Sequence, residues 1–199
     1  MNNPWDARFS GEDFYYGEVP NSFFADFLSS VKFKGKILLP GEGEGRNAVY
    51  AAGLGWDVTA FDSSEVARAK ALKYARQKSL KITYHLIDIA DYQSFPDFYD
   101  VVALVFVHQP SKIRKTFHAE LIKALKPGGL FFMAAFAKEQ INHHSGGPSD
   151  PDLLYSFDDV KNDFLELKQT KLCQEKTHIK EGRHQGLAEV LIYTGQKMD

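Results

Sequence analysis

Short apolar stretches alternate with amphipathic stretches along the first two thirds of the chain. Five apolar stretches are typical of buried strands, at residues 36–39, 57–61, 82–87, 100–107 and 130–137. Helical patterns lie between them: an alanine-rich stretch after Gly45, a helix from the Ser63-Ser64 cap through Lys78, and a helix over residues 111–125. Sequential strands with helical crossovers predict a doubly wound parallel sheet, because βαβ units are right-handed.

The last third of the chain has a different pattern. We expect a helix at the capping sequence Ser156-Phe-Asp-Asp159, followed by extended stretches at about residues 167–179 and 187–196. The segment that joins them, residues 180–186, has no helical pattern, which predicts a terminal antiparallel hairpin. The predicted fold class is therefore α/β: a doubly wound, Rossmann-like, mostly parallel seven-stranded sheet with a C-terminal antiparallel hairpin and helices on both faces.

Aromatic residues are concentrated before the first strand. They include Trp5, Phe9 and the run Phe14-Tyr15-Tyr16, and Asn21 then caps an aromatic-rich helix. We expect this segment to form a lid. The chain is thus interpreted as one domain, residues 1–199, with a lid at 1–32, a cofactor-binding core at 33–137, and a substrate-side loop, helix and hairpin at 138–199.

Composition and charge narrow the class of protein. The 24 Lys and Arg residues are balanced by 26 Asp and Glu, which argues against a nucleic-acid binder that relies on bulk positive charge. The single cysteine, Cys173, cannot form an internal disulfide, which favours a reducing, cytoplasmic setting. We expect neither a secretory signal nor a membrane span, and either a monomer or a homodimer.

The glycine-rich turn Gly41-Glu-Gly-Glu-Gly45 follows the first strand, where open α/β sheets bind ligands. Asp62 ends the second strand, about 20 residues later, where a carboxylate typically accepts hydrogen bonds from a ribose. The turn also satisfies the G-x-G-x-x-A dinucleotide pattern, but Glu42 and Glu44 would place negative charge beside a pyrophosphate. S-adenosylmethionine (SAM) has no phosphate and carries positive charge, so it suits an acidic turn better than a nicotinamide dinucleotide does.

Several motifs together resemble a known family. The glycine turn, Asp62, Asp88 after the third strand and Leu125-Lys-Pro-Gly-Gly129 resemble the class I SAM-dependent methyltransferases, over nearly the whole chain. Residues 41–47, 146–148 and 181–186, with His108, resemble the tellurite-resistance and thiopurine-methyltransferase-like branch. The resemblance implies methyl transfer from SAM to a small-molecule acceptor, with a thiol or a metalloid oxyanion among the candidates. The alternatives are an NAD-dependent oxidoreductase and a non-catalytic SAM-binding module.

The resemblance also implies which residues contact the cofactor. The turn would surround the methionine end, Asp62 the ribose, and Asp88 with Ile89 the adenine. Many class I enzymes have an acidic residue two positions before the first glycine, where Leu39 stands here, and Glu42 is the candidate replacement. The complete predicted cofactor set is Gly41, Glu42, Gly43, Gly45, Asn47, Asp62, Ser63, Asp88 and Ile89.

The acceptor side of the site is expected in the second half of the chain. His108, after the fourth strand, and His184, in the hairpin connection, are the predicted catalytic residues, because an imidazole can take a proton from a hydroxyl or amine acceptor. A helix position predicts that His118 faces solvent, and the adjacent His143-His144 pair makes a poor metal site. The predicted substrate-binding residues are Tyr16, Arg114, Gly146, Gly147 and Arg183.

Overall fold

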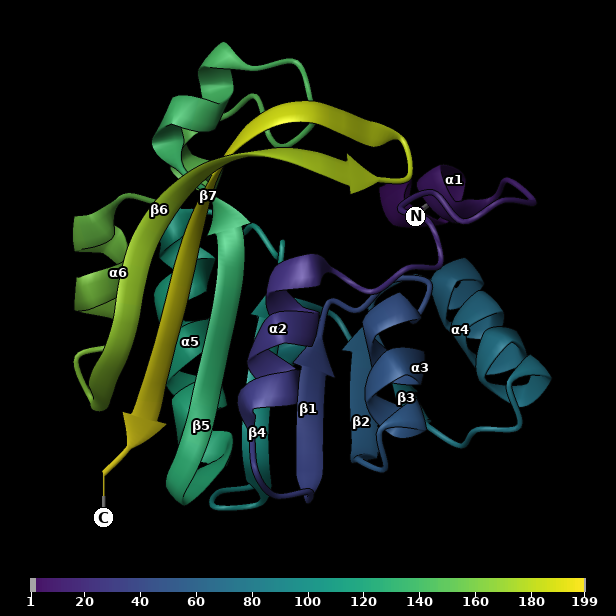
Figure 1. Ribbon diagram of the computed structural model, residues 1–199, viewed down its shortest axis with the longest axis horizontal. Coiled ribbons are helices and arrows are strands. Elements are labelled where there is room, and N and C mark those ends of the chain that lie inside the picture. The colour runs from purple at the N-terminus through teal and green to yellow at the C-terminus, as the bar shows by residue number, and fades with distance from the viewer. Residues whose placement is uncertain (1–2, 199) are drawn as a thin grey trace.

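The computed structural model describes residues 3–198, whose strands form one seven-stranded sheet in the order β3-β2-β1-β4-β5-β7-β6. Strands β1 to β5 are parallel, and β7 runs antiparallel to both β5 and β6 (Figure 1). The predicted α/β class and terminal hairpin are therefore confirmed. The strands are β1 (Lys36–Pro40), β2 (Asp57–Asp62), β3 (Thr83–Leu86), β4 (Tyr99–Val105), β5 (Leu125–Phe136), β6 (Leu167–Glu181) and β7 (His184–Lys197).

Helices cover both faces of the sheet, because side chains of a strand alternate between its faces. Ile37 and Leu39 of β1 pack into the same buried cluster as α2 and α3, whereas Leu38 packs into the cluster that contains α5 and α6. Figure 1 shows α2 and α3 in front of the sheet and α5 behind it. The helices are α1 (Pro4–Phe9), α2 (Ser22–Ser30), α3 (Arg46–Gly53), α4 (Glu65–Gln77), α5 (Ser111–Ala124) and α6 (Phe157–Asp163), with short 3-10 helices η1 (Ile89–Asp91), η2 (Lys138–Asn142) and η3 (Pro151–Leu153).

The order of the strands determines where a ligand can bind. Strand β1 lies between β2 and β4, so the loops after β1 and β4 leave the sheet side by side and then diverge. Ligands of open α/β sheets bind at such a switch point, outside the carboxyl ends of the strands. The loop at residues 41–45 lies there, as the sequence predicts.

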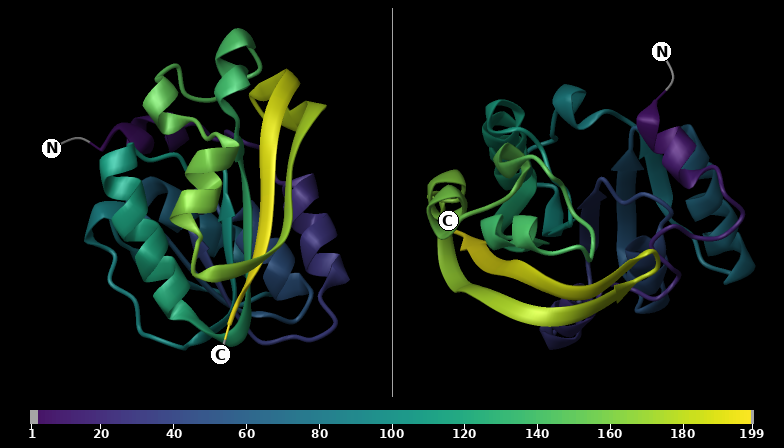
Figure 2. Two further views of the ribbon diagram at one scale, coloured as in Figure 1. Left: turned by 90° about the vertical axis from the view of Figure 1, so that its left-hand side faces the viewer. Right: turned by 90° about the horizontal axis from the view of Figure 1, so that it is seen from above.

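The terminal hairpin is longer than the sequence predicts. Lys180 pairs with Gln185 and Glu181 with His184, so only Gly182 and Arg183 form the connection, and the expected connection at residues 180–186 is wrong. Gly182 has a φ of 57°, which a tight two-residue turn with glycine first requires. The two strands bend over the carboxyl-end edge of the sheet and bring this turn close to α1 (Figure 2).

Strand β5 also begins earlier than predicted. It starts at Leu125, and an irregularity in its pairing with β4, between Tyr99 and Val101, accommodates the Pro-Gly-Gly sequence. The predicted ranges 1–32 and 138–199 each extend past the described residues, by Met1-Asn2 and Asp199. Within residues 3–198, no helix has the length and apolar character that crossing a lipid bilayer requires.

Candidate functional site

The loop between β1 and α3 is built from three glycines with left-handed backbone. Gly41, Gly43 and Gly45 have φ values of 58°, 60° and 87°, which other residues rarely adopt. A Cβ added at Gly41 would lie 2.7 Å from Val107 Cγ2, and one at Gly45 would lie 2.6 Å from Ala71 Cβ. The glycines are therefore required both by conformation and by close packing against the end of β4 and against α4.

Asp62 holds this glycine loop at the end of β2. Its Oδ2 accepts a hydrogen bond from the Gly43 amide at 3.0 Å, and its Oδ1 accepts one from the Ser64 amide at 2.9 Å. Burial raises the pKa of Asp62, and the backbone hydrogen bonds oppose that shift. A carboxylate has about four acceptor positions, so a fixed Asp62 can still accept hydrogen bonds from a ribose diol.

Glu42 serves the start of α3, where the N-cap residue Gly45 has no side chain. Its Oε1 accepts from the Ala48 amide at 2.7 Å, and its Oε2 accepts from Asn47 Nδ2 at 3.3 Å. Burial raises the pKa of Glu42 to about 7 despite these bonds. A positively charged ligand group beside this carboxyl would favour its ionised form.

Glu44 holds the N-terminal segment onto the glycine loop. Its Oε2 accepts from the Tyr15 amide at 2.7 Å, and its Oε1 pairs with Lys70 Nζ at 2.8 Å. The acidic character of the turn was expected to suit a cationic ligand. The Glu42 and Glu44 carboxylates both form hydrogen bonds or ion pairs within the protein as well. No local pattern in the sequence predicts these partners.

Of the other predicted cofactor residues, Ile89 lies against the glycine loop, and Ser63 and Asp88 follow the neighbouring strands β2 and β3. Ile89 Cδ1 lies 3.7 Å from a Cβ built at Gly41. Asp88 is exposed and caps η1, and the Ser63 carbonyl accepts from Asn3 Nδ2 at 2.6 Å. The structure therefore brings the residues after β1, β2 and β3 together, as the sequence predicts.

Helix α1 covers the loop from above. Phe9 is only 3% exposed, and its Cζ lies 3.3 Å from a Cβ built at Gly43. Asp6 Oδ1 accepts from Ser64 Oγ at 2.6 Å and from the Val66 amide at 3.2 Å, which fastens α1 to the start of α4. The N-terminal segment thus lies over both the glycine loop and the Asp62 region.

Aromatic contacts lead from this cover to the predicted acceptor side. The Phe9 and Tyr16 ring centroids are 6.2 Å apart, and those of Tyr16 and His184 are 5.1 Å apart. A Cβ built at Gly146 would lie 2.4 Å from His184 Cγ. Three predicted acceptor-side residues therefore adjoin one another and, through Phe9, the glycine loop.

The hairpin turn is fastened to the same region. Glu181 Oε1 accepts from Asn21 Nδ2 at 3.0 Å, and its other oxygen pairs with Arg46 at the start of α3. Arg46 also donates to the Tyr16 carbonyl at 3.2 Å, and the exposed Arg183 donates its amide to the Tyr15 carbonyl at 2.9 Å. These partners are far apart in the sequence, so the sequence analysis missed the Arg46–Glu181 pair and the bond from Asn21 to Glu181; the predicted role of Asn21 as a helix cap is confirmed.

His184 is half-buried and chemically available. Burial lowers the pKa of its imidazole, and the nearby Arg8 and Arg46 lower it further. The lowered pKa favours the neutral form of the ring, and no hydrogen bond from residues 3–198 occupies its nitrogens. A neutral imidazole with a free nitrogen can accept a proton from an acceptor hydroxyl.

His108 is bonded differently. Its Nδ1 lies 2.8 Å from the Leu153 carbonyl, and the Phe136 amide lies 3.5 Å from its Nε2. Burial lowers the pKa of His108 to about 4, so this imidazole is a weak base. The bonding does not support the predicted catalytic role; the His108 ring instead stacks on Phe136, with centroids 5.5 Å apart.

The loop with Gly146 and Gly147 lies against both His184 and Phe136. Gln140 Nε2 donates to the Gly146 carbonyl at 2.8 Å and to Ser145 Oγ at 2.9 Å, which fixes the loop. A Cβ at Gly147 would lie 2.9 Å from Phe136 Cδ2. The loop thus touches His184 through Gly146 and Phe136 through Gly147.

Arg114 requires a correction. It is buried on α5, where its Nε donates to Asp163 at 2.6 Å and its terminal nitrogen donates to Asp159 at 2.9 Å. Its guanidinium is paired with two carboxylates of α6. Arg114 therefore joins α5 to α6 and does not make the predicted acceptor contact. His118, expected to face solvent, is also buried, with Nδ1 3.1 Å from Asp163. A helical pattern does not reveal that polar residues join one helix to a second.

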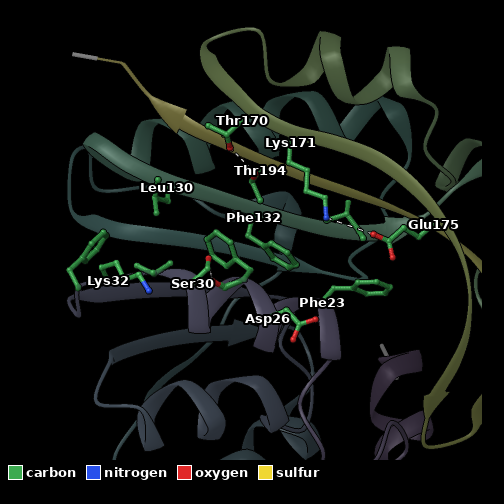
Figure 3. A pocket seen from close by; sticks show the side chains of 15 residues that line it. Phe23, Asp26, Ser30, Lys32, Leu130, Phe132, Thr170, Lys171, Glu175 and Thr194 are labelled. Carbon is green, nitrogen blue, oxygen red and sulfur yellow. Dashed lines mark hydrogen bonds and ion pairs between the residues drawn. The ribbon is translucent and has the colours of Figure 1, made fainter.

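A groove lies outside this site. This groove, of about 680 Å³, separates α2 from β5, β7 and β6, and none of the predicted site residues lines it (Figure 3). Phe23, Phe27 and Phe132 form its apolar part, and Lys171 and Glu175 lie on its β6 side. Within the described residues, no three or more His, Cys, Asp or Glu side chains group as metal ligands.

Comparison with known proteins supports a methyltransferase. Residues 37–129 match the family model described as "Methyltransferase domain". A protein of Mycobacteroides abscessus, named 2-heptyl-1-hydroxyquinolin-4(1H)-one methyltransferase, is 24% identical over 162 residues, which cover 71% of each chain.

Solved structures share the fold at low sequence identity. One, titled "Conversion of a Disulfide Bond into a Thioacetal Group during Echinomycin Biosynthesis", has a TM-score of 0.82 at 16% identity and covers 98% of this chain and 91% of its own. The N-methyltransferase NodS of Bradyrhizobium japonicum, solved with S-adenosylhomocysteine (SAH), has a TM-score of 0.72 at 14% identity, covering 98% and 97%. TehB of Haemophilus influenzae has a TM-score of 0.73 at 18% identity, covering 89% and 62%.

Proposed function

We propose that the chain, a class I SAM-dependent methyltransferase, methylates a small molecule held between the glycine loop and the wall that contains Tyr16, His184, Gly146 and Gly147. The observation that carries the proposal is the continuous contact from Gly43 through Phe9 and Tyr16 to His184. This contact puts the cofactor loop next to a wall with an available imidazole. The similar Mycobacteroides abscessus protein is named for a small-molecule acceptor, which supports the same class here.

The residues present fit SAM. Asp62 is fixed beside the loop with free acceptor positions for the ribose, and Ile89 offers an apolar contact for the adenine. Glu42 is a buried carboxyl with a raised pKa, which the positive methionine end would return to its ionised form. When bound, SAM supplies a methyl carbon on a sulfonium: the acceptor atom bonds to that carbon while the carbon–sulfur bond breaks and its electron pair stays on sulfur.

The chain itself aligns the reactants and excludes water. Helix α1 and the hairpin turn cover the glycine loop, which limits competing hydrolysis and fixes the approach of the acceptor. A hydroxyl acceptor loses its proton to a free nitrogen of His184. No strong base is needed for an acceptor that arrives as an anion.

The candidate acceptors differ in the atom that receives the methyl group. A thiolate or a metalloid oxyanion, as the resemblance to the tellurite-resistance branch implies, would be held by charge, and Arg183 is exposed at the hairpin turn for that purpose. A hydroxyl acceptor would depend on His184 instead. We therefore propose that both classes be compared directly.

The cellular setting is also part of the proposal. Cys173 is half-buried in β6 as a free thiol, which suits a reducing cytoplasm. The balanced charge suits a small-molecule partner better than a nucleic acid. Size-exclusion chromatography decides between a monomer and a homodimer.

The function is tested by transfer of labelled methyl groups from SAM to a panel of thiols, selenite, tellurite and aromatic hydroxyl compounds. The expected result is SAH formation that depends on one acceptor class. Binding of SAM without turnover on any acceptor would indicate a silent binding module. Binding of NAD in place of SAM would indicate the oxidoreductase alternative.

A further inference from the structure

We propose that the acceptor is a planar aromatic ring and that Phe106, the residue after β4, selects it by stacking against it. The inference rests on the proposed function and narrows its acceptor class. It is argued from the backbone conformation of Phe106, from the rings that surround it and from the absence of charge on those rings.

The backbone of Phe106 is unusual. Its φ is 53°, in the left-handed region that bulky side chains rarely adopt. Its amide donates to the Ala134 carbonyl at 2.7 Å, so pairing with β5 holds the strained conformation in place. Strained residues that the surrounding structure holds in place are concentrated at ligand sites, and Phe106 stands at the carboxyl end of a central strand.

The position of Phe106 relative to the cofactor follows from its neighbour. Val107 packs against the glycine loop, with its Cγ2 2.7 Å from a Cβ built at Gly41. Phe106 is therefore the sequence neighbour of a residue that contacts the glycine loop. The left-handed turn directs consecutive side chains differently: Val107 packs with the α5 side of the sheet and Phe106 with the α2 side.

Phe106, His108 and Phe136 form a group that we call the aromatic wall. The Phe106 and Phe136 centroids are 4.5 Å apart, and the His108 ring lies nearly parallel to Phe136, at an interplanar angle of 16°. Phe106 is half-buried, so part of its ring surface stays accessible. Aromatic rings attract further rings in offset or edge-to-face arrangements.

The aromatic wall carries no charge. His108 is neutral because burial lowers its pKa to about 4, although the hydrogen bond between its Nδ1 and the Leu153 carbonyl opposes that shift. Among the described residues, no Lys or Arg lies over the Phe106 or Phe136 ring. An oxyanion placed there would lose its hydration without gaining a counter-charge, whereas an aromatic ring would lose little.

The polar end of such an acceptor has a place as well. The loop that contains Gly146 and Gly147 touches His184 through Gly146 and Phe136 through Gly147. It therefore links the aromatic wall to the His184 imidazole. In this proposal, an aromatic ring on Phe106 places its hydroxyl on the side of His184 and Tyr16. This arrangement favours a ring-bearing hydroxyl compound over a metalloid oxyanion.

The test uses the full chain loaded with SAH and two aromatic probes, 1-hydroxyquinolin-4(1H)-one and 1-naphthol. Calorimetry measures their affinity for wild type, Phe106→Leu, Phe106→Asn and the control Phe157→Leu, which alters an exposed phenylalanine on α6. Leucine keeps apolar bulk without a π face, and asparagine tolerates positive φ without a ring. We expect both Phe106 variants to bind the probes at least about tenfold more weakly, with SAH affinity within twofold and the control unchanged.

A second readout separates stacking from packing. Methyl transfer to 2-mercaptoethanol should change less than twofold in Phe106→Leu, while KM for an aromatic acceptor rises. Unchanged probe affinity in both variants, or equal losses for the thiol and the aromatic acceptor, would overturn the proposal. If wild type methylates the thiol but binds neither aromatic probe, the aromatic class is wrong and the proposed function stands. Absence of SAH binding would defeat both.

Discussion

Asp62 is the residue on which we expect cofactor binding to depend most directly. It offers a fixed carboxylate beside the glycine loop, so we expect Asp62→Ala to weaken SAH binding by roughly 1–3 kcal/mol through loss of charge-assisted hydrogen bonds. Calorimetry measures the loss, and circular dichroism checks the fold. Asp57→Ala, at the exposed opposite end of β2, is the matched control. Unchanged affinity in a folded Asp62→Ala protein would show that another group holds the ribose.

The two histidines should behave differently. His184→Ala should lower kcat/KM for a hydroxyl acceptor by about 100-fold, because its free nitrogen takes the proton. His108→Ala should mainly raise KM, because both its nitrogens have partners and the pKa of its ring is about 4. Steady-state kinetics separates the two effects. Full activity in both variants would mean that both histidines have purely structural roles.

Glu42 gives a pH dependence. Its pKa is about 7 in the folded protein and close to the ordinary value of about 4.5 in the unfolded chain. Between these values the folded protein holds a proton that the unfolded chain has released, so the Glu42 contribution to stability falls as pH rises through this window. Urea denaturation at pH 5 and 7.5 should show this fall, and Glu42→Gln should reduce it. An equal fall in both proteins contradicts the assignment.

At the scale of elements, Arg114 joins α5 to α6. Arg114→Ala leaves Asp163 buried beside His118 without its main counter-charge, and we expect a loss of about 3–5 kcal/mol in the free energy of unfolding. Lys112→Ala, an exposed position on α5, is the control. Normal stability with a raised acceptor KM would restore the acceptor role that the sequence predicts.

The sequence predicts elements well where the signal is local. The strand–turn–helix order, the glycine loop and Asp62 follow from short patterns, and the structure has them as expected. The predicted hairpin connection at residues 180–186 was wrong because the polar residues there are typical of a loop. They pair as strands, and the positive φ of Gly182 permits the short turn between them. The burial of Arg114 and His118 depends on a second helix, which an amphipathic pattern does not locate.

At the scale of the whole molecule, the cofactor edge of the sheet is closed by two distant parts of the chain. The N-terminal segment is held there by Glu44 and Asp6, and the hairpin turn is held by the Arg46–Glu181 pair. Figure 2 shows both segments at this edge. Because these contacts join residues far apart in sequence, they exist only in the folded chain. The methyltransferase activity and the SAM cofactor expected from the motifs agree with the family model that matches residues 37–129.

Calorimetric titration of the whole chain with SAH and, separately, with NAD tests the central claim most directly. The claim is that the glycine loop and Asp62 form a SAM site. The predicted result is saturable one-site binding of SAH that weakens in Asp62→Ala but not in Asp57→Ala, with no comparable heat from NAD. Tight binding of NAD with no heat from SAH would contradict it.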